Sequence, residues 1–160
     1  MSRRSYGILT MGLCLLTIGT IAAYAATSKT AQGTWKLNVA KSSYEQMQAP
    51  KYEKLVVMND QPDAIKWLLT GASADGKTYV STYDGPVDGQ ARPYGKSAVG
   101  NTISYSRSQS GLEWVVKDKS GAVIEKGVGH VSSDGNTLTL KGTEGADGKA
   151  AFVSVFDRVQ

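Results

Sequence analysis

The chain has 160 residues, which fits one domain, and a formal net charge of +4. Its basic residues are scattered rather than clustered, so the charge pattern gives no support for a nucleic-acid-binding protein. The one cysteine, Cys14, lies in an N-terminal stretch that we expect to be removed, which excludes disulfides, a thiolate nucleophile and cysteine-ligated metals from the mature protein.

That N-terminal stretch has the features of a secretory signal peptide. Arg3 and Arg4 give it a positive start, residues 8–23 form an apolar run without a charge, and Ala-Tyr-Ala before Ala26 places small residues where a signal peptidase reads them. We therefore predict a signal peptide over residues 1–25 and a protein that is exported to the periplasm or the extracellular space.

Two alternatives stay open for this end of the chain. One is an uncleaved membrane anchor, although the apolar run is short for a membrane span and is diluted by Gly12 and Gly19. The other concerns the export route, because the arginine pair followed by Tyr6 partly fits a twin-arginine signal. No second apolar stretch follows, so we expect no stable membrane insertion after cleavage, and we expect a monomer.

After the leader the sequence reads as short strands joined by tight turns. We expect a flexible tail over residues 26–32 and one domain over residues 33–160. Alternation of apolar and polar residues predicts about nine or ten strands, with a short helix within residues 39–49. The predicted strands cover residues 33–37, 52–58, 64–70, 78–83, 102–108, 112–117, 122–132, 137–141 and 150–159, with a further short strand around 90–94.

The turns decide the predicted architecture. Several strands are joined by Asp-Gly pairs, and glycine tolerates the positive φ that tight antiparallel hairpins need. Short links favour pairing between neighbours, and a sheet of many strands curls because closure removes its exposed edges. We therefore predict an all-β, antiparallel up-and-down barrel of about 8–10 strands, with a two-sheet sandwich as the main alternative.

Two less regular features bear on the barrel. Residues 84–101 contain several glycines and prolines, and we expect them to form a mobile loop at the mouth. Gly127 and Gly129 lie inside a predicted strand, where glycine permits a sharp bend at a barrel corner.

Three residues give the chain a resemblance to a known superfamily. Gly33-x-Trp35 on the first strand and Arg158 near the end of the last resemble the lipocalin and fatty-acid-binding superfamily. The resemblance implies that the tryptophan lies at the closed base of a barrel and that the arginine packs over its ring, joining the first and last strands. The opening Gly-Thr-Trp-Lys-Leu-Asn and the late Asp157-Arg158 also resemble small exported bacterial lipocalin-like proteins, whose function is generally unassigned.

Residues suited to catalysis or metal binding are few. His130 is the only histidine of the chain, and no Gly-x-Ser-x-Gly accompanies it. One histidine without a cysteine argues against a zinc site. Glu113 and Glu125 lie on neighbouring predicted strands, where we expect exposed carboxylates opposite lysines rather than a pair of catalytic acids. We expect no enzymatic activity, no metal and no cofactor.

The aromatic residues indicate a binding function instead. Five of them fall on one parity of successive strands: Trp67, Tyr79, Tyr83, Tyr105 and Trp114. If this face points inward, it lines a cavity for a small, partly apolar ligand, and Arg107 among the tyrosines holds a carboxylate. A filled core with Arg107 in solvent is the alternative. The protein would then be a protein-binding module, such as an inhibitor of an extracellular hydrolase, that uses the N-terminal tail or the 84–101 loop.

Overall fold

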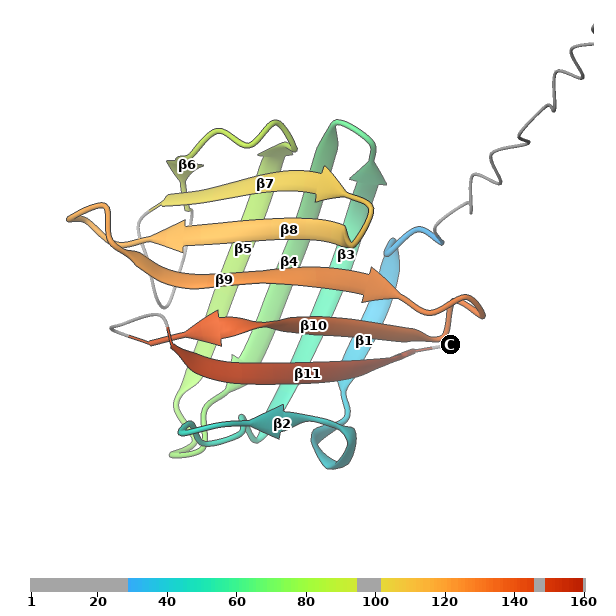
Figure 1. The fold of residues 1–160 in the computed structure, drawn as a ribbon. Coiled ribbons are helices and arrows are strands. Elements are labelled where there is room, and N and C mark those ends of the chain that lie inside the picture. Colours follow the sequence, from blue (N-terminus) through green and yellow to red (C-terminus); the bar gives the residue numbers. More distant parts are fainter. Residues whose placement is uncertain (1–28, 95–101, 146–148, 160) are drawn as a thin grey trace, which may run out of the picture.

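The computed structural model describes residues 29–94, 102–145 and 149–159, and their strands form one antiparallel sheet (Figure 1). The predicted signal peptide, its cleavage site and residues 95–101 lie outside the described residues. The strands are β1 (Gly33–Leu37), β2 (Ser43–Tyr44), β3 (Tyr52–Gln61), β4 (Ala64–Ala72), β5 (Thr78–Pro86), β6 (Arg92–Pro93), β7 (Thr102–Ser108), β8 (Gly111–Lys117), β9 (Val123–Val131), β10 (Thr137–Glu144) and β11 (Ala150–Arg158). Every strand predicted from the sequence is present, and β2 is an addition.

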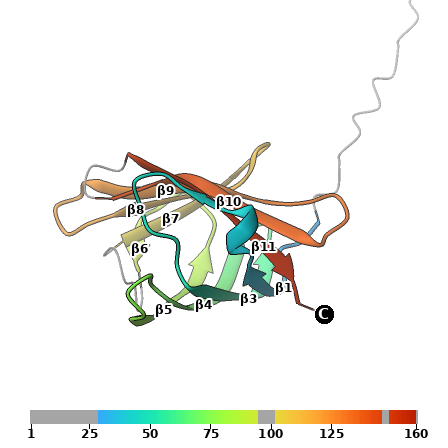
Figure 2. The same cartoon turned by 90° about the horizontal axis from the view of Figure 1, so that it is seen from below.

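The sheet is an up-and-down meander whose first and last strands pair with each other. Its order is β5-β4-β3-β1-β11-β10-β9-β8-β7-β6, so the β1–β11 pair lies in the middle. In Figure 1 strands β1, β3, β4 and β5 form one layer and β7–β11 cross it as a second layer, and Figure 2 shows the two layers facing each other. The predicted all-β barrel-type fold is confirmed. Because the β1–β11 ladder makes both layers one sheet, the two-sheet sandwich is excluded.

The barrel has one seam, between β5 and β6, where no ladder joins the described strands. The loop after β5 crosses part of this seam: the Val87 amide holds it to the Asp63 carbonyl of the β3–β4 turn (2.8 Å), and the Gly89 amide donates across the seam to the Tyr105 carbonyl of β7 (2.7 Å). The rings of Tyr83 and Tyr105 meet across the same seam, with centroids 4.8 Å apart. A loop and side chains, rather than strand pairing, therefore hold the described barrel together here.

The segment between β1 and β3 contains a short helix, as the sequence predicted, but residues 43–44 of the predicted helical stretch form the strand β2 instead. The helix is a 3₁₀ helix, η1 (Val39–Lys41), and the Asn38 side chain caps it by accepting a hydrogen bond from the Lys41 amide (3.2 Å). β2 then runs antiparallel to β11, with Tyr44 opposite Phe152. In Figure 1 this segment lies along the lower end of the fold, below β11.

Trp35 and Arg158 meet as the superfamily resemblance implied. They are direct partners in the β1–β11 ladder, and the Arg158 guanidinium carbon lies 4.0 Å from the centroid of the fully buried Trp35 ring. Arg158 Nε donates to the Gly135 carbonyl (2.6 Å), and Nη1 donates to the Gln32 carbonyl (2.8 Å). The cation–π contact and the hydrogen bonds of Arg158 therefore stabilise the pairing of the first and last strands.

The same contact explains the glycine two residues before the tryptophan. Gly33 has a φ of 137°, a conformation that side-chain-bearing residues rarely adopt. A Cβ at this position would also collide with Nη1 of Arg158. The glycine of the Gly-x-Trp pattern therefore leaves room for the Arg158 guanidinium to lie over the Trp35 ring.

Residues 29–32 differ from the flexible tail expected from the sequence. The Ala31 amide donates to Asp60 Oδ2 (2.6 Å), and the Trp35 indole donates to the Ala31 carbonyl (2.7 Å). Since the Gln32 carbonyl also accepts from Arg158, this stretch is fixed against the barrel. Residues 26–28 lie outside the described residues.

Replacing Arg158 with alanine is expected to lower the free energy of unfolding by roughly 2–3 kcal/mol, because a cation–π contact and charge-assisted hydrogen bonds are lost. Urea unfolding followed by tryptophan fluorescence measures this change. Lys36→Ala is the matched control, because Lys36 lies on β1 with its side chain exposed. The role given to Arg158 is wrong if the two variants unfold at the same urea concentration.

Candidate functional site

A cavity of about 810 Å³ lies between the two layers of the sheet. Side chains that alternate inward along the strands form its walls; in β4, for example, Ile65, Trp67 and Leu69 all line it. Trp35 and Val116 are fully buried and lie outside the cavity lining, in a filled part of the interior. The barrel is therefore partly filled and partly open.

Five of the six residues that the sequence singled out for ligand contact line this cavity. They are Trp67, Tyr79, Tyr105, Trp114 and Arg107. Tyr83 is buried but lies behind the cavity, where it packs on Tyr105 and donates its hydroxyl hydrogen to the Pro86 carbonyl (2.9 Å). The alternation along the strands thus identified which side chains point inward. Whether an inward side chain also borders the cavity depends on its position along the barrel, and Tyr83 does not.

A hydrogen bond fixes the aromatic wall in place. The indole of Trp67 donates to the Tyr105 hydroxyl at 2.9 Å, and both side chains are buried. Burial raises the pKa of Tyr105 well above its usual value, so the phenol stays neutral. The Tyr94 ring meets Trp67 edge-on, with centroids 6.1 Å apart. This wall is therefore ordered without a ligand.

Gly127 provides the space for Trp114. The two residues are direct partners in the β8–β9 ladder, and a Cβ at Gly127 would lie 2.5 Å from the Trp114 ring and 2.6 Å from the Lys141 carbonyl oxygen. We expected this glycine to let the strand bend, whereas its observed role is to accept the ring of Trp114. The Trp114 indole then donates to Glu125 Oε1 (2.7 Å).

Arg107 lies at the rim of the cavity, and its positive charge is already paired with a carboxylate. Its guanidinium forms an ion pair with Asp60, whose side chain is only 8% exposed, and donates to the Gln61 carbonyl (2.7 Å). It also donates to the Pro62 carbonyl (3.3 Å). The guanidinium is therefore held by the end of β3 and the turn after it, and it does not extend as a free cation among the tyrosines.

Three glutamates that the sequence did not place in the site also line the cavity: Glu53 of β3, Glu125 of β9 and Glu144 of β10. Glu125 and Glu144 stand directly opposite each other in the β9–β10 ladder. Burial raises the pKa of all three carboxyl groups, that of Glu125 to about 7. The expectation that Glu125 is an exposed carboxylate opposite a lysine is therefore wrong.

Tyr79 contributes its hydroxyl to this acidic part of the cavity. Its side chain extends from β5 across Gly71 of β4 and donates a hydrogen bond to Glu53 Oε1 of β3 (2.5 Å). Burial, and next the Glu53 carboxylate, raise the pKa of Tyr79 far above its usual range. The phenol is therefore a permanent neutral donor.

The alternation of side chains contained a signal for these acids. Lys126 is exposed, which places its neighbour Glu125 on the opposite, inward face together with the buried Val131. Glu53 likewise shares the parity of the buried Leu55. Applied to charged residues as strictly as to aromatic ones, parity would have placed both glutamates inside.

The remaining candidate chemistry is limited. His130 borders the cavity but is exposed. Within residues 29–94, 102–145 and 149–159, no three His, Cys, Asp or Glu side chains come together as metal ligands. The described part of the chain also contains no helix of the length and apolarity that a membrane crossing requires.

Comparison with known proteins identifies the fold. The chain is similar to the crystal structure of a mutant of the fluorescent protein UnaG, with a TM-score of 0.54 and 14% identity, over 81% of this chain and 96% of that one. At this identity the likeness shows a shared fold, of the lipocalin and fatty-acid-binding (calycin) type. No protein-family model matches the sequence, and no curated protein does.

The buried glutamates predict how stability depends on pH. A carboxyl group whose pKa is raised by folding binds more protons in the folded state, so its stabilising contribution is lost as pH rises through the folded pKa. The wild type should therefore lose thermal stability between about pH 5 and pH 8. Because the pKa of Glu125 is about 7, Glu125→Gln should flatten this loss.

Circular dichroism melting curves across that pH range measure the effect. Glu45→Gln is the control, because Glu45 is exposed on the outside of the fold and should leave the wild-type slope unchanged. Parallel slopes for the wild type and Glu125→Gln would show that Glu125 does not titrate as described.

Proposed function

We propose that the protein is an exported monomeric carrier that binds a small, partly apolar molecule non-covalently in its cavity and catalyses no reaction. The observation that carries this proposal is the cavity of about 810 Å³ with aromatic walls. Small-molecule sites are concave, mostly apolar and about 300–1,000 Å³ in volume, with a few polar groups that orient the ligand. The interior of this barrel has that combination.

The aromatic side chains of the cavity wall are held in place by hydrogen bonds, and this supports a binding function. The indoles of Trp67 and Trp114 each donate a hydrogen bond to a side chain within the barrel, Tyr105 and Glu125 respectively. Side chains that are held before a ligand arrives lose little conformational entropy when it binds, so more of the contact energy contributes to affinity.

The alternative of a protein-binding module has less support. It assumed a filled interior, whereas an open volume remains. It also assigned the contact to the N-terminal tail or to the 84–101 loop. Residues 29–32 of that tail are engaged by Asp60 and Arg158, and residues 95–101 lie outside the described part of the chain.

Export is supported by the leader. Expressed with residues 1–25 in a bacterial host, the protein should be recovered from the periplasm with Ala26 as its first residue, because the Ala-Tyr-Ala before it suits signal peptidase. Intact-mass measurement of the periplasmic fraction checks this. Ala25→Phe should block cleavage and serves as the control. Recovery of the uncleaved wild-type chain in the membrane fraction would favour the anchor instead.

N-phenyl-1-naphthylamine, an uncharged apolar fluorophore, should bind the mature protein and brighten as it leaves water. Leu69→Trp should weaken this binding by about tenfold or more, because Leu69 lines the cavity and the larger ring occupies its volume. Leu68→Trp is the matched control, since Leu68 is the next residue of β4 and faces the other side of the sheet.

Two results would overturn the proposed function: no probe binding by the folded wild type, or equal loss of binding in both tryptophan variants. Native mass spectrometry with solvent extraction of freshly purified protein complements the titration, because a carrier retains a fraction of its natural ligand.

A further inference from the structure

The charged side chains that line the cavity without being exposed are all acidic. Glu53, Glu125 and Glu144 come from three different strands and all line it. None of the ion pairs among the described residues includes any of these three carboxyl groups. Glu125 accepts a hydrogen bond from Trp114 and Glu53 accepts one from Tyr79, whereas the structure gives Glu144 no such bond within its described ranges.

Carboxyl groups gathered in this way oppose folding when nothing compensates their charge. Burial disfavours their ionised forms, and after burial the neighbouring acids raise the pKa values further: Glu144 acts on both Glu53 and Glu125. The phenols of Tyr44, Tyr79 and Tyr105 also face these acids, and they bring no positive charge. An apolar side chain at each position would pack without this cost, so the acids point to a bound group that balances them.

The basic groups that border the cavity do not supply that balance. Arg107 is paired with Asp60 at the rim. Lys77 is mostly exposed and pairs with Asp75 at 2.9 Å. Lys29 and His130 are both exposed. A ligand with a carboxylate would therefore face three acids and meet no buried unpaired cation among the described residues, which reverses the anchoring role first expected of Arg107.

We propose that the ligand is an organic cation: a protonated amine on an apolar body. This inference rests on the proposed binding function and adds the charge of the ligand to it. The ammonium group lies against Glu125 and Glu144, which are opposite each other in adjacent strands. The apolar body lies against the wall formed by Trp67 and Tyr105.

Trp114 suits the same occupant. Its indole is hydrogen-bonded to Glu125, so an aromatic ring stands beside the carboxylate that receives the ammonium. Aromatic rings attract cations through their quadrupole, and the attraction grows when the pair is removed from water. An inorganic cation fits less well, because the described residues offer no group of three metal ligands and the cavity has room for a whole molecule.

Three fluorescent dansyl amides test the charge of the ligand directly. They share the dansyl ring and the same alkyl chain, and they end in an ammonium, a methyl or a carboxylate group. Titrated into the mature protein at low salt and about pH 8, where carboxyl groups with raised pKa values are largely ionised, the ammonium probe should bind about tenfold tighter than the carboxylate probe, with the methyl probe between them.

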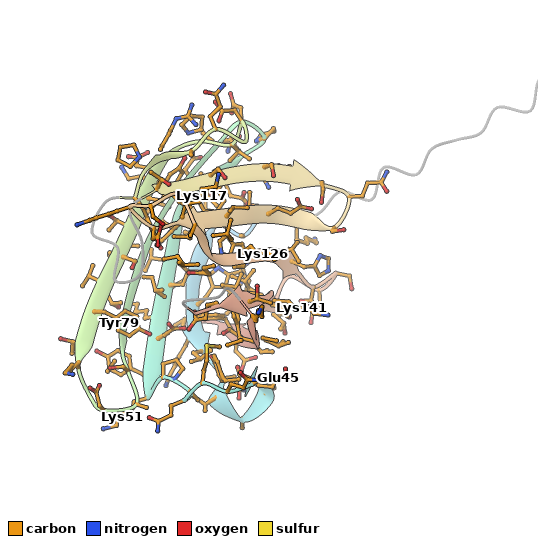
Figure 3. The ribbon with its side chains drawn as sticks, turned by 60° about the vertical axis from the view of Figure 1, so that its left-hand side comes forward. Glu45, Lys51, Tyr79, Lys117, Lys126 and Lys141 are labelled. Atoms are coloured by element: carbon orange, nitrogen blue, oxygen red, sulfur yellow. The ribbon has the colours of Figure 1, made fainter. Side chains whose placement is uncertain are left out.

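Glu125→Gln and Glu144→Gln assign the preference to these side chains. Each should weaken binding of the ammonium probe by about tenfold and change binding of the methyl probe by less than about twofold. The methyl probe thereby reports that the cavity is intact. Glu45→Gln is the charge-matched control, because Glu45, labelled in Figure 3 on the segment that follows β2, is exposed and does not line the cavity.

The outcomes separate this inference from the function on which it rests. Equal affinity for all three probes, or a preference for the carboxylate, overturns the cationic ligand and leaves the binding function standing. Failure of the folded protein to bind any probe overturns both. An unchanged ammonium preference in the two glutamine variants also overturns the inference, because the charge selection then comes from elsewhere.

Discussion

The contact between Arg158 and Trp35 is the interaction on which this fold depends, because it joins the first strand of the sheet to the last. β1 and β11 pair in the middle of the strand order, so without this pair the remaining strands would divide into two meanders with open edges. The guanidinium needs the space left by Gly33. A glycine, a tryptophan and an arginine therefore decide that the strands curl into one barrel.

Curling alone does not produce a cavity, since inward side chains normally fill a barrel of this size. Here glycines occupy inward positions on neighbouring strands. Gly127 faces Trp114 in β8 and Gly142 in β10, and the Trp114 ring lies in the space that a side chain at Gly127 would fill. The Trp114 ring is thereby accommodated against β9, and the aromatic side chains fixed by hydrogen bonds give the open interior ordered walls. The same features make the site rigid before any ligand arrives.

The buried glutamates lower the stability of the empty barrel, and the proposed binding function gives a reason for their presence. Glu125 has a pKa of about 7, so near neutral pH the empty protein divides between a protonated form and a form with a costly buried charge. A cationic ligand removes this cost by compensating the charge, and a ligand that binds only the folded state also stabilises it by mass action. Under the proposed binding of a cation, the residues that weaken the empty barrel also select the ligand.

The sequence by itself determined the strands and the shared face of the aromatic side chains, because alternation is local, and its resemblance to a known superfamily implied the contact between Trp35 and Arg158. Trp67 points inward whichever strand lies beside it. Only the tertiary structure decided the partner of Arg107, since Asp60 meets it where the distant ends of β3 and β7 come together. It also decided that Glu125 and Glu144 share one enclosed volume, because the charge of a site depends on which remote side chains the closed sheet brings together.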